Sequence, residues 1–99
     1  MVYKVVVSVR TQREIEHAID YYALHSVDAP LNFIIELAEA YEILAKNPFF
    51  RIRYKNIRVL NLKRFPYSLY YTIADDKKII KIISCFHNSR DPKRRPKNL

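Results

Sequence analysis

The first ten residues alternate between apolar and polar side chains, which is the pattern of a half-buried strand. The apolar face of this predicted strand consists of Tyr3, Val5, Val7 and Val9. After these residues, the spacing between apolar residues lengthens to that of a helix. Thr11 and Glu14 have the spacing of a capping box, so we expect the first helix to begin at Thr11.

Two amphipathic helices are predicted in the first half of the chain. The apolar stripe of the first helix is formed by Ile15, Ala18, Ile19 and Tyr22. Asp28 and Pro30 open the second helix, and Asn47-Pro48 ends it. The stripe of this helix is formed by Ile34, Leu37, Ala38, Tyr41, Leu44 and Ala45. Because the break between the helices is short, we expect an antiparallel helical hairpin that packs on a sheet.

Strand periodicity returns in the second half of the chain. Strands are predicted at residues 57–62, 67–73 and 79–86, with residues 50–54 as an optional fourth. Pairing Ile73 with Ile79 would gather four side chains at the far end of the last hairpin. These are Lys63, Arg64, His87 and Arg90. A slip of one residue in this register would turn every side chain to the other face.

The element order predicts an α+β fold, in which the helices pack on one face of a largely antiparallel sheet. A chain of 99 residues suits one domain, which we assign to residues 1–92, followed by a flexible basic tail at residues 93–99. The sequence has no signal-peptide core and no run near the ~18 apolar residues of a membrane span. We therefore expect a cytoplasmic protein.

The sequence has no glycine and one cysteine, and these counts argue against several kinds of cofactor and metal site. Phosphate-binding loops of the nucleotide-binding folds need glycine for close backbone approach, so no nucleotide cofactor is expected. Cys85 cannot form an internal disulfide and has no metal-ligand spacing, so no metal is expected either. Without glycine, we expect the turns to use residues that tolerate a left-handed backbone. These are Asn47, Asn56, Asp75, Asp76 and Asn88.

The net charge of +8 is unevenly distributed. Residues 1–48 carry four basic and seven acidic side chains, whereas residues 49–99 carry fourteen basic and three acidic ones. A basic half favours a polyanionic target or an acidic protein partner. The alternative is that these side chains only solvate exposed strands and the tail.

One face of the sheet is expected to bind a partner. It lies opposite the core face of Leu60, Leu62, Leu69, Tyr71 and Ile83. We expect the partner to contact Tyr70, Ile80, Ile82 and Phe86. The whole face would consist of Val59, Asn61, Lys63, Tyr70, Thr72, Ile80, Ile82, Ser84 and Phe86. A face this apolar is unusual in water and indicates a docking surface, unless the C-terminal tail or a second copy of the chain in a crystal dimer covers it.

Three short motifs follow one another in the second half of the chain. They are Arg58-x-Leu60, Phe65-Pro66-Tyr67-x-Leu69-x-Tyr71 and Ile82-Ile83-x-Cys85-x-His87-x-x-Arg90-x-Pro92. With the preceding strand and helical hairpin, they resemble the RelE/ParE superfamily of bacterial toxins. The resemblance implies a type II toxin-antitoxin (plasmid stabilisation) module, in which a cognate antitoxin wraps the toxin and holds it inactive.

The superfamily has two branches with different chemistry. In the ribonuclease branch, which cleaves mRNA on the ribosome without metal, His87 would be the general base or acid. The phosphate would be held by Arg58, Arg64, Arg90 and Lys63. Members of this branch commonly place a tyrosine near the end of the last strand, but here no tyrosine follows Tyr71.

In the other branch the toxin poisons DNA gyrase and hydrolyses nothing. The His-x-x-Arg-x-Pro ending and the Phe-Pro-Tyr entry to the hairpin are closer to this branch, the ParE type, in which His87 and Arg90 would have structural roles. A third class is a nontoxic nucleic-acid-binding domain, whose stacking platform would consist of Arg58, Tyr67, Tyr70, Tyr71 and Phe86. Exposure of Tyr70 and Phe86 in a row would support this class. His17 lies off the apolar stripe of the first helix, and we expect it to be solvated.

Overall fold

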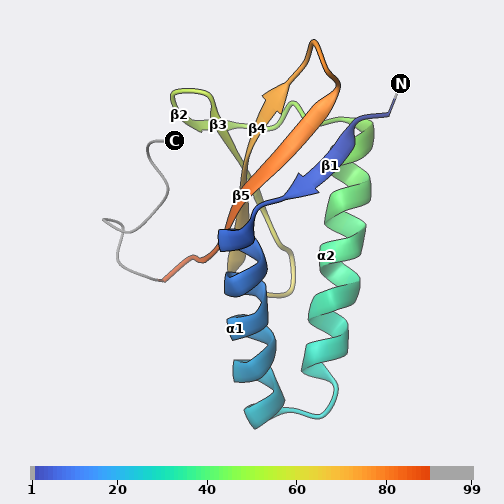
Figure 1. Ribbon diagram of the computed structural model, residues 1–99. Helices are drawn as coiled ribbons and strands as arrows, with labels where there is room; N and C mark the ends of the chain where they lie inside the picture. Colours follow the sequence, from blue (N-terminus) through green and yellow to red (C-terminus); the bar gives the residue numbers. More distant parts are fainter. Residues whose placement is uncertain (1, 90–99) are drawn as a thin grey trace.

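The computed structural model describes residues 2–89 as a five-stranded sheet with two helices packed against it (Figure 1). The elements are β1 (Lys4–Val7), α1 (Val9–His25), α2 (Ala29–Lys46), β2 (Ile52–Tyr54), β3 (Ile57–Asn61), β4 (Tyr67–Ala74) and β5 (Ile79–His87). The strand order is β1-β5-β4-β3-β2, in which β1 runs parallel to β5 and the other neighbours are antiparallel. The predicted α+β architecture is confirmed, and the optional fourth strand is β2.

The first helix begins earlier than predicted. Ser8 is the N-cap of α1, and its Oγ accepts a hydrogen bond from the backbone N–H of Thr11 at 3.1 Å. The Thr11 side chain is fully buried, and its hydroxyl donates to the carbonyl oxygen of Ile82 in β5. The prediction of a capping box that starts at Thr11 was therefore wrong. Thr11 joins the helix to the sheet instead of capping it.

The core face of α1 is confirmed, but the face of α2 is rotated from the prediction. On α1, Ala18 is buried, and Ile15, Ile19 and Tyr22 pack against the core. The buried apolar residues of α2 are Phe33, Leu37, Ala40 and Leu44, whereas Ile34 is 46% exposed. The ring of Phe33 lies among those of Tyr22, Phe65 and Tyr67, with centroids 5.1–5.7 Å away. This aromatic cluster sets the rotation of α2.

The register of the last hairpin also differs from the prediction. Ala74 pairs with Ile79 across a four-residue turn, so the pairing is shifted by one position at the turn. Tyr71 then pairs with Ile82 and Tyr70 with Ser84, which leaves Ile83 as the extra residue of a β-bulge. Side chains beyond the bulge therefore point to faces that simple alternation does not predict.

The predicted docking face is wrong as a single surface. Ile80 and Ile82 are fully buried in the core with the helices, whereas Tyr70 and Phe86 belong to a second cluster. The second cluster consists of Ile57, Val59, Tyr70, Ile83 and Phe86. Ile83, predicted in the core with Leu69, lies in this second cluster because the one-position shift at the turn puts Ile80 and Ile82 on the core face and so turns Ile83 to the other. Partner binding by Tyr70, Ile80, Ile82 and Phe86 stays a prediction, and the structure does not expose these side chains.

The turns without glycine use lysine where the backbone becomes left-handed. Lys55 has a φ of 52° and Lys78 a φ of 54°. Asn56, Asp75 and Asp76 lie in the same two turns, as predicted, but none of them takes the left-handed position. Within residues 2–89, neither helix is long and apolar enough to cross a membrane.

Candidate functional site

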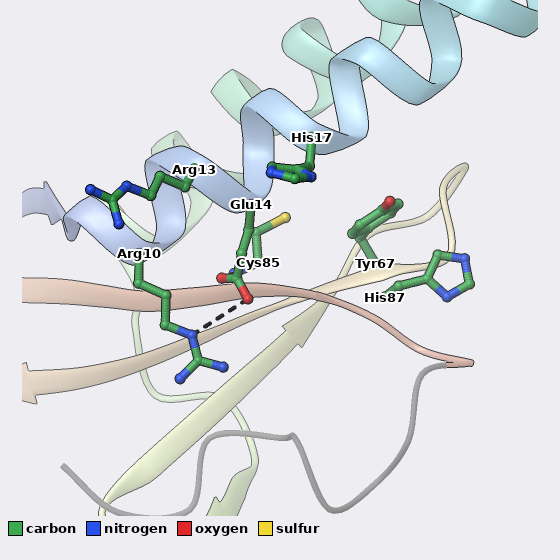
Figure 2. Close-up of a pocket in the computed structure, with 7 residues that line it drawn as sticks. All are labelled: Arg10, Arg13, Glu14, His17, Tyr67, Cys85 and His87. Carbon is green, nitrogen blue, oxygen red and sulfur yellow. Dashed lines mark hydrogen bonds and ion pairs between the residues drawn. The ribbon is translucent and has the colours of Figure 1, made fainter.

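A cleft opens where α1 passes the end of β5 and the start of β4 (Figure 2). We call it the α1 cleft. It encloses about 260 Å³ and is lined by Arg10, Arg13, Glu14, His17, Tyr67, Cys85 and His87. A second hollow of about 510 Å³ shares His17, Tyr67 and His87 with it and adds Tyr21 and Ser89. The two hollows therefore adjoin along the same helix.

One face of α1 supplies most of the polar groups of this cleft. Arg10, Arg13, His17 and Tyr21 recur at three- and four-residue spacing, which brings them to the same side of the helix. Arg13 and His17 are both exposed, and within residues 2–89 Arg13 has no ion-pair partner. The ring of Tyr21 is 56% exposed and lies 4.5 Å from that of His25.

Glu14 closes the floor of the cleft. Its Oε1 accepts hydrogen bonds from the Ser84 hydroxyl at 2.8 Å and from the backbone N–H of Cys85 at 3.0 Å. Its Oε2 lies 3.5 Å from Nε of Arg10, as an ion pair one helical turn apart. Both oxygens of this carboxylate are therefore occupied by donors of the protein itself.

His87 lies at the rim of the cleft, where β5 ends. Its ring is half-buried, and Nδ1 accepts a hydrogen bond from the backbone N–H of Ser89 at 3.0 Å. In the neutral ring the proton is then on Nε2, which becomes a donor. The ring of Tyr67 packs edge-on against that of His87, with centroids 5.0 Å apart. These contacts fix the orientation of the imidazole.

Cys85 is not a nucleophile at neutral pH. Burial, followed by the negative charge of Glu14, raises the pKa of the Cys85 thiol to about 12. The reactive species is the thiolate, so the protonated thiol acts as a small apolar side chain of the core. Within the part of the chain that the structure describes, no three histidine, cysteine or carboxylate side chains are grouped to hold a metal ion.

The basic residues predicted for catalysis occupy different places. Nη1 of Arg58 donates to the carbonyl oxygen of Phe50 at 2.6 Å, and its guanidinium lies over the ring of Phe49. Lys63 and Arg64 donate their backbone N–H groups to the carboxylate of Glu36 on α2. Arg90 lies outside the described residues.

The predicted grouping at the hairpin end is therefore not the arrangement that the structure shows. His87 lines the cleft with α1, whereas Lys63 and Arg64 line a separate groove beside α2, and Arg58 supports β2. The catalytic roles of these residues stay predictions. Sequence reasoning missed Arg10 and Arg13, although their helical spacing with His17 was a usable signal.

Comparison with known proteins places these features in a family. Residues 5–92 match the family described as the ParE toxin of the type II toxin-antitoxin system, parDE. The search of curated proteins found no match.

The solved structures that share the fold include the following three. The chromosomal ParDE system from P. aeruginosa aligns at 15% identity and a TM-score of 0.70, covering 87% of this chain and 96% of that one. A chain of the RelBE2 toxin-antitoxin complex from Mycobacterium tuberculosis aligns at 17% identity and a TM-score of 0.64, and the alignment covers 88% of this chain and 99% of that one. A chain of the RelE-RelB complex from Pyrococcus horikoshii aligns at 16% identity and a TM-score of 0.56, and the alignment covers 92% of this chain and 100% of that one. The chain, matched over residues 5–92, belongs to the ParE family of type II toxin-antitoxin toxins.

Proposed function

We propose that this protein is held inactive by a cognate antitoxin and that, when released, it stops growth by binding and poisoning DNA gyrase. Membership of the ParE family supports the toxin role. The similar solved structures are described as toxin-antitoxin systems or complexes, which supports an antitoxin partner. Gyrase is proposed as the target because the C-terminal motifs are closer to the ParE branch than to the ribonuclease branch.

The engagement of Arg58 is the observation that favours binding over RNA cleavage. A metal-free ribonuclease needs a cation that stabilises the charged phosphorane. The Arg58 guanidinium is instead hydrogen-bonded to the Phe50 carbonyl and packed over Phe49. These contacts hold the guanidinium at the sheet edge and occupy its Nη1 group before any phosphate is bound.

The tip of the helical hairpin supports a protein partner. Leu24, Val27 and Leu31 are 83%, 96% and 62% exposed, and they lie at the end of α1, in the connection and at the start of α2. Clustered exposed apolar side chains are typical of surfaces that another protein covers. Regulation by a bound antitoxin would bury such residues.

Ribosome-dependent RNA cleavage is the second candidate, and one observation favours it. His87 is half-buried beside an open cleft, with Nε2 as a donor in the neutral ring. As a general acid His87 would first have to take up a proton and become an imidazolium, which could then give the Nε2 proton to the leaving oxygen. The nontoxic nucleic-acid-binding alternative has less support, since Tyr70 and Phe86 are only 4% and 3% exposed and form no stacking platform.

Assays on the purified protein and expression experiments in cells test the proposal. We expect the protein to inhibit gyrase supercoiling and to stabilise gyrase-cleaved DNA, and we expect coexpression of the neighbouring reading frame to restore growth. Primer extension on ribosome-bound messages should show no defined cut. A cut that His87→Ala abolishes would overturn the gyrase target in favour of the ribonuclease. Folded protein that arrests no growth would argue against toxicity itself.

A further inference from the structure

The α1 cleft changes character along the helix. The end of the cleft nearest the N-terminus of α1 carries the guanidinium groups of Arg10 and Arg13. Its other end carries the ring of His17, and the adjoining second hollow carries the ring of Tyr21. Figure 2 shows the two arginines and His17 following one another along α1, with Tyr67 and His87 across the cleft. The cleft is therefore cationic at one end and aromatic at the other.

The cationic end suits an anion with several oxygens. Within residues 2–89, Arg13 has no ion-pair partner, and its planar fork of donors matches the oxygens of a phosphate. Glu14 would repel an anion if its charge were open, but both of its oxygens already accept from Ser84, Cys85 and Arg10. Taken together, the side chains that line the cleft attract a negatively charged ligand.

The aromatic end suits a flat ring. Tyr21 is 56% exposed although tyrosine is a large, half-apolar side chain, and His17 beside it is exposed as well. Bases stack on such rings, and the stacking tolerates any base because every base has a π-face. The hollows of about 260 and 510 Å³ are near the size of sites that hold small organic ligands, roughly 300–1,000 Å³.

We propose that the α1 cleft and the adjoining hollow together bind a nucleotide unit, with the phosphate held by Arg13, beside the Arg10–Glu14 ion pair, and the base stacked on Tyr21 and His17. The same chemistry is offered by a free nucleoside monophosphate and by one nucleotide of a single strand. The site lies on the helix side of the protein, away from Arg58, Lys63 and Arg64. This binding goes beyond the proposed function and does not depend on gyrase being the target.

Calorimetric titration of the full chain tests the site with four probes: adenosine 5′-monophosphate, adenosine, inorganic phosphate and a single-stranded trinucleotide. We expect saturable binding of the monophosphate, with adenosine and phosphate each binding more weakly. Saturation by the monophosphate identifies a free nucleotide as a sufficient ligand. Binding of the trinucleotide alone, with the same dependence on the cleft residues, identifies a strand as the source.

Matched variants separate the cleft from general charge and from general aromatic contact. Arg13→Gln and Tyr21→Ala should each weaken binding about tenfold, because each removes one charged or stacking contact. Their controls are Arg53→Gln and Tyr54→Ala on the exposed strand β2, which should change binding by less than about twofold. Circular dichroism of each variant confirms that it is folded.

Three results would overturn the site. The first is that neither the monophosphate nor the trinucleotide binds to the folded protein. The second is equal weakening by Arg13→Gln and Arg53→Gln, which would show nonspecific attraction to a basic protein. The third is adenosine binding as tightly as its monophosphate, which would remove the role of the arginines. None of these results bears on gyrase inhibition, so the two proposals fail separately.

Discussion

Glu14 of α1 accepts a hydrogen bond from the hydroxyl of Ser84 in β5 at 2.8 Å, across 70 positions of sequence. The same oxygen accepts the backbone N–H of Cys85, two residues after the bulge residue Ile83. Because a bulge interrupts the ladder, its polar groups need partners from outside the sheet. The carboxylate supplies one and thereby fixes α1 against β5, which forms the cleft.

Replacing Glu14 by alanine should destabilise the fold. Ser84 is fully buried, so its hydroxyl and the adjacent Cys85 N–H would lose their acceptor, at a cost of about 1–3 kcal/mol in the free energy of unfolding. Glu14→Gln keeps an acceptor oxygen and should lose less. Urea denaturation measures both, with Glu16→Ala on the exposed side of α1 as the control. Equal stability of Glu14→Ala and Glu16→Ala would contradict the structural role of Glu14.

Glu36 has a similar role at the other helix. It is 7% exposed, and its carboxylate accepts the backbone N–H groups of Lys63 and Arg64 in the connection between β3 and β4. In Glu36→Ala we expect these two amides to exchange with solvent about tenfold faster or more, since they lose a charged acceptor. Hydrogen exchange by NMR measures this directly. The control is Glu42→Ala, an exposed position of α2, which should leave both exchange rates unchanged.

The substitution Arg58→Lys distinguishes a structural role of this residue from a catalytic one. Arg58→Lys keeps the charge but cannot reproduce the guanidinium contact with the Phe50 carbonyl and the Phe49 ring. We expect a loss of about 1 kcal/mol in the free energy of unfolding, the usual worth of such a hydrogen bond. Arg53→Lys on the exposed β2 is the matched control. If Arg58→Lys is as stable as the wild type but loses toxicity, the residue acts on the target instead.

The sequence predicted the hairpin strands but not their register, for a physical reason. Alternation in the sequence predicted strands at residues 67–73 and 79–86, and the structure has them at Tyr67–Ala74 and Ile79–His87. The bulge at Ile83 depends on Thr11, Ser8 and Glu14, whose groups bond the backbone around it. The alternation of apolar and polar residues within a strand cannot reveal hydrogen-bond partners that lie about 70 positions away in the sequence.

The candidate site was predictable only in part, for the same reason. His87 was singled out because it ends a strand in a polar run, and it does line a cleft. Its neighbours there come from α1, whereas the prediction supplied Lys63 and Arg64 from an assumed register. Arg13 and His17 share a helical face with Tyr21, but such a stripe is also what a solvated face contains. Only the packing of α1 beside β5 distinguishes the two.

Cys85 should make the stability of the protein fall in alkali. The folded thiol has a pKa of about 12 against 9.0 as the reference value, because burial disfavours the thiolate. The contribution of the protonated thiol to the free energy of unfolding is therefore complete below pH 9. It is lost as the pH rises toward 12, because the thiol ionises in the unfolded chain before it ionises in the folded one. The slope for one group is at most about 1.4 kcal/mol per pH unit.

Tyr41 adds a second decline that begins one unit higher. Burial raises the pKa of Tyr41 from 10.0 to about 12, so its contribution starts to be lost near pH 10. Between pH 9 and 10 the decline therefore belongs mainly to Cys85, and Cys85→Ala should flatten it there while leaving the decline above pH 10. Urea denaturation at pH 7, 9, 10 and 11 measures both intervals, and the value at pH 7 corrects for the lost packing of the thiol. An unchanged slope between pH 9 and 10 in Cys85→Ala would show that the thiol ionises in the folded state as readily as in the unfolded one.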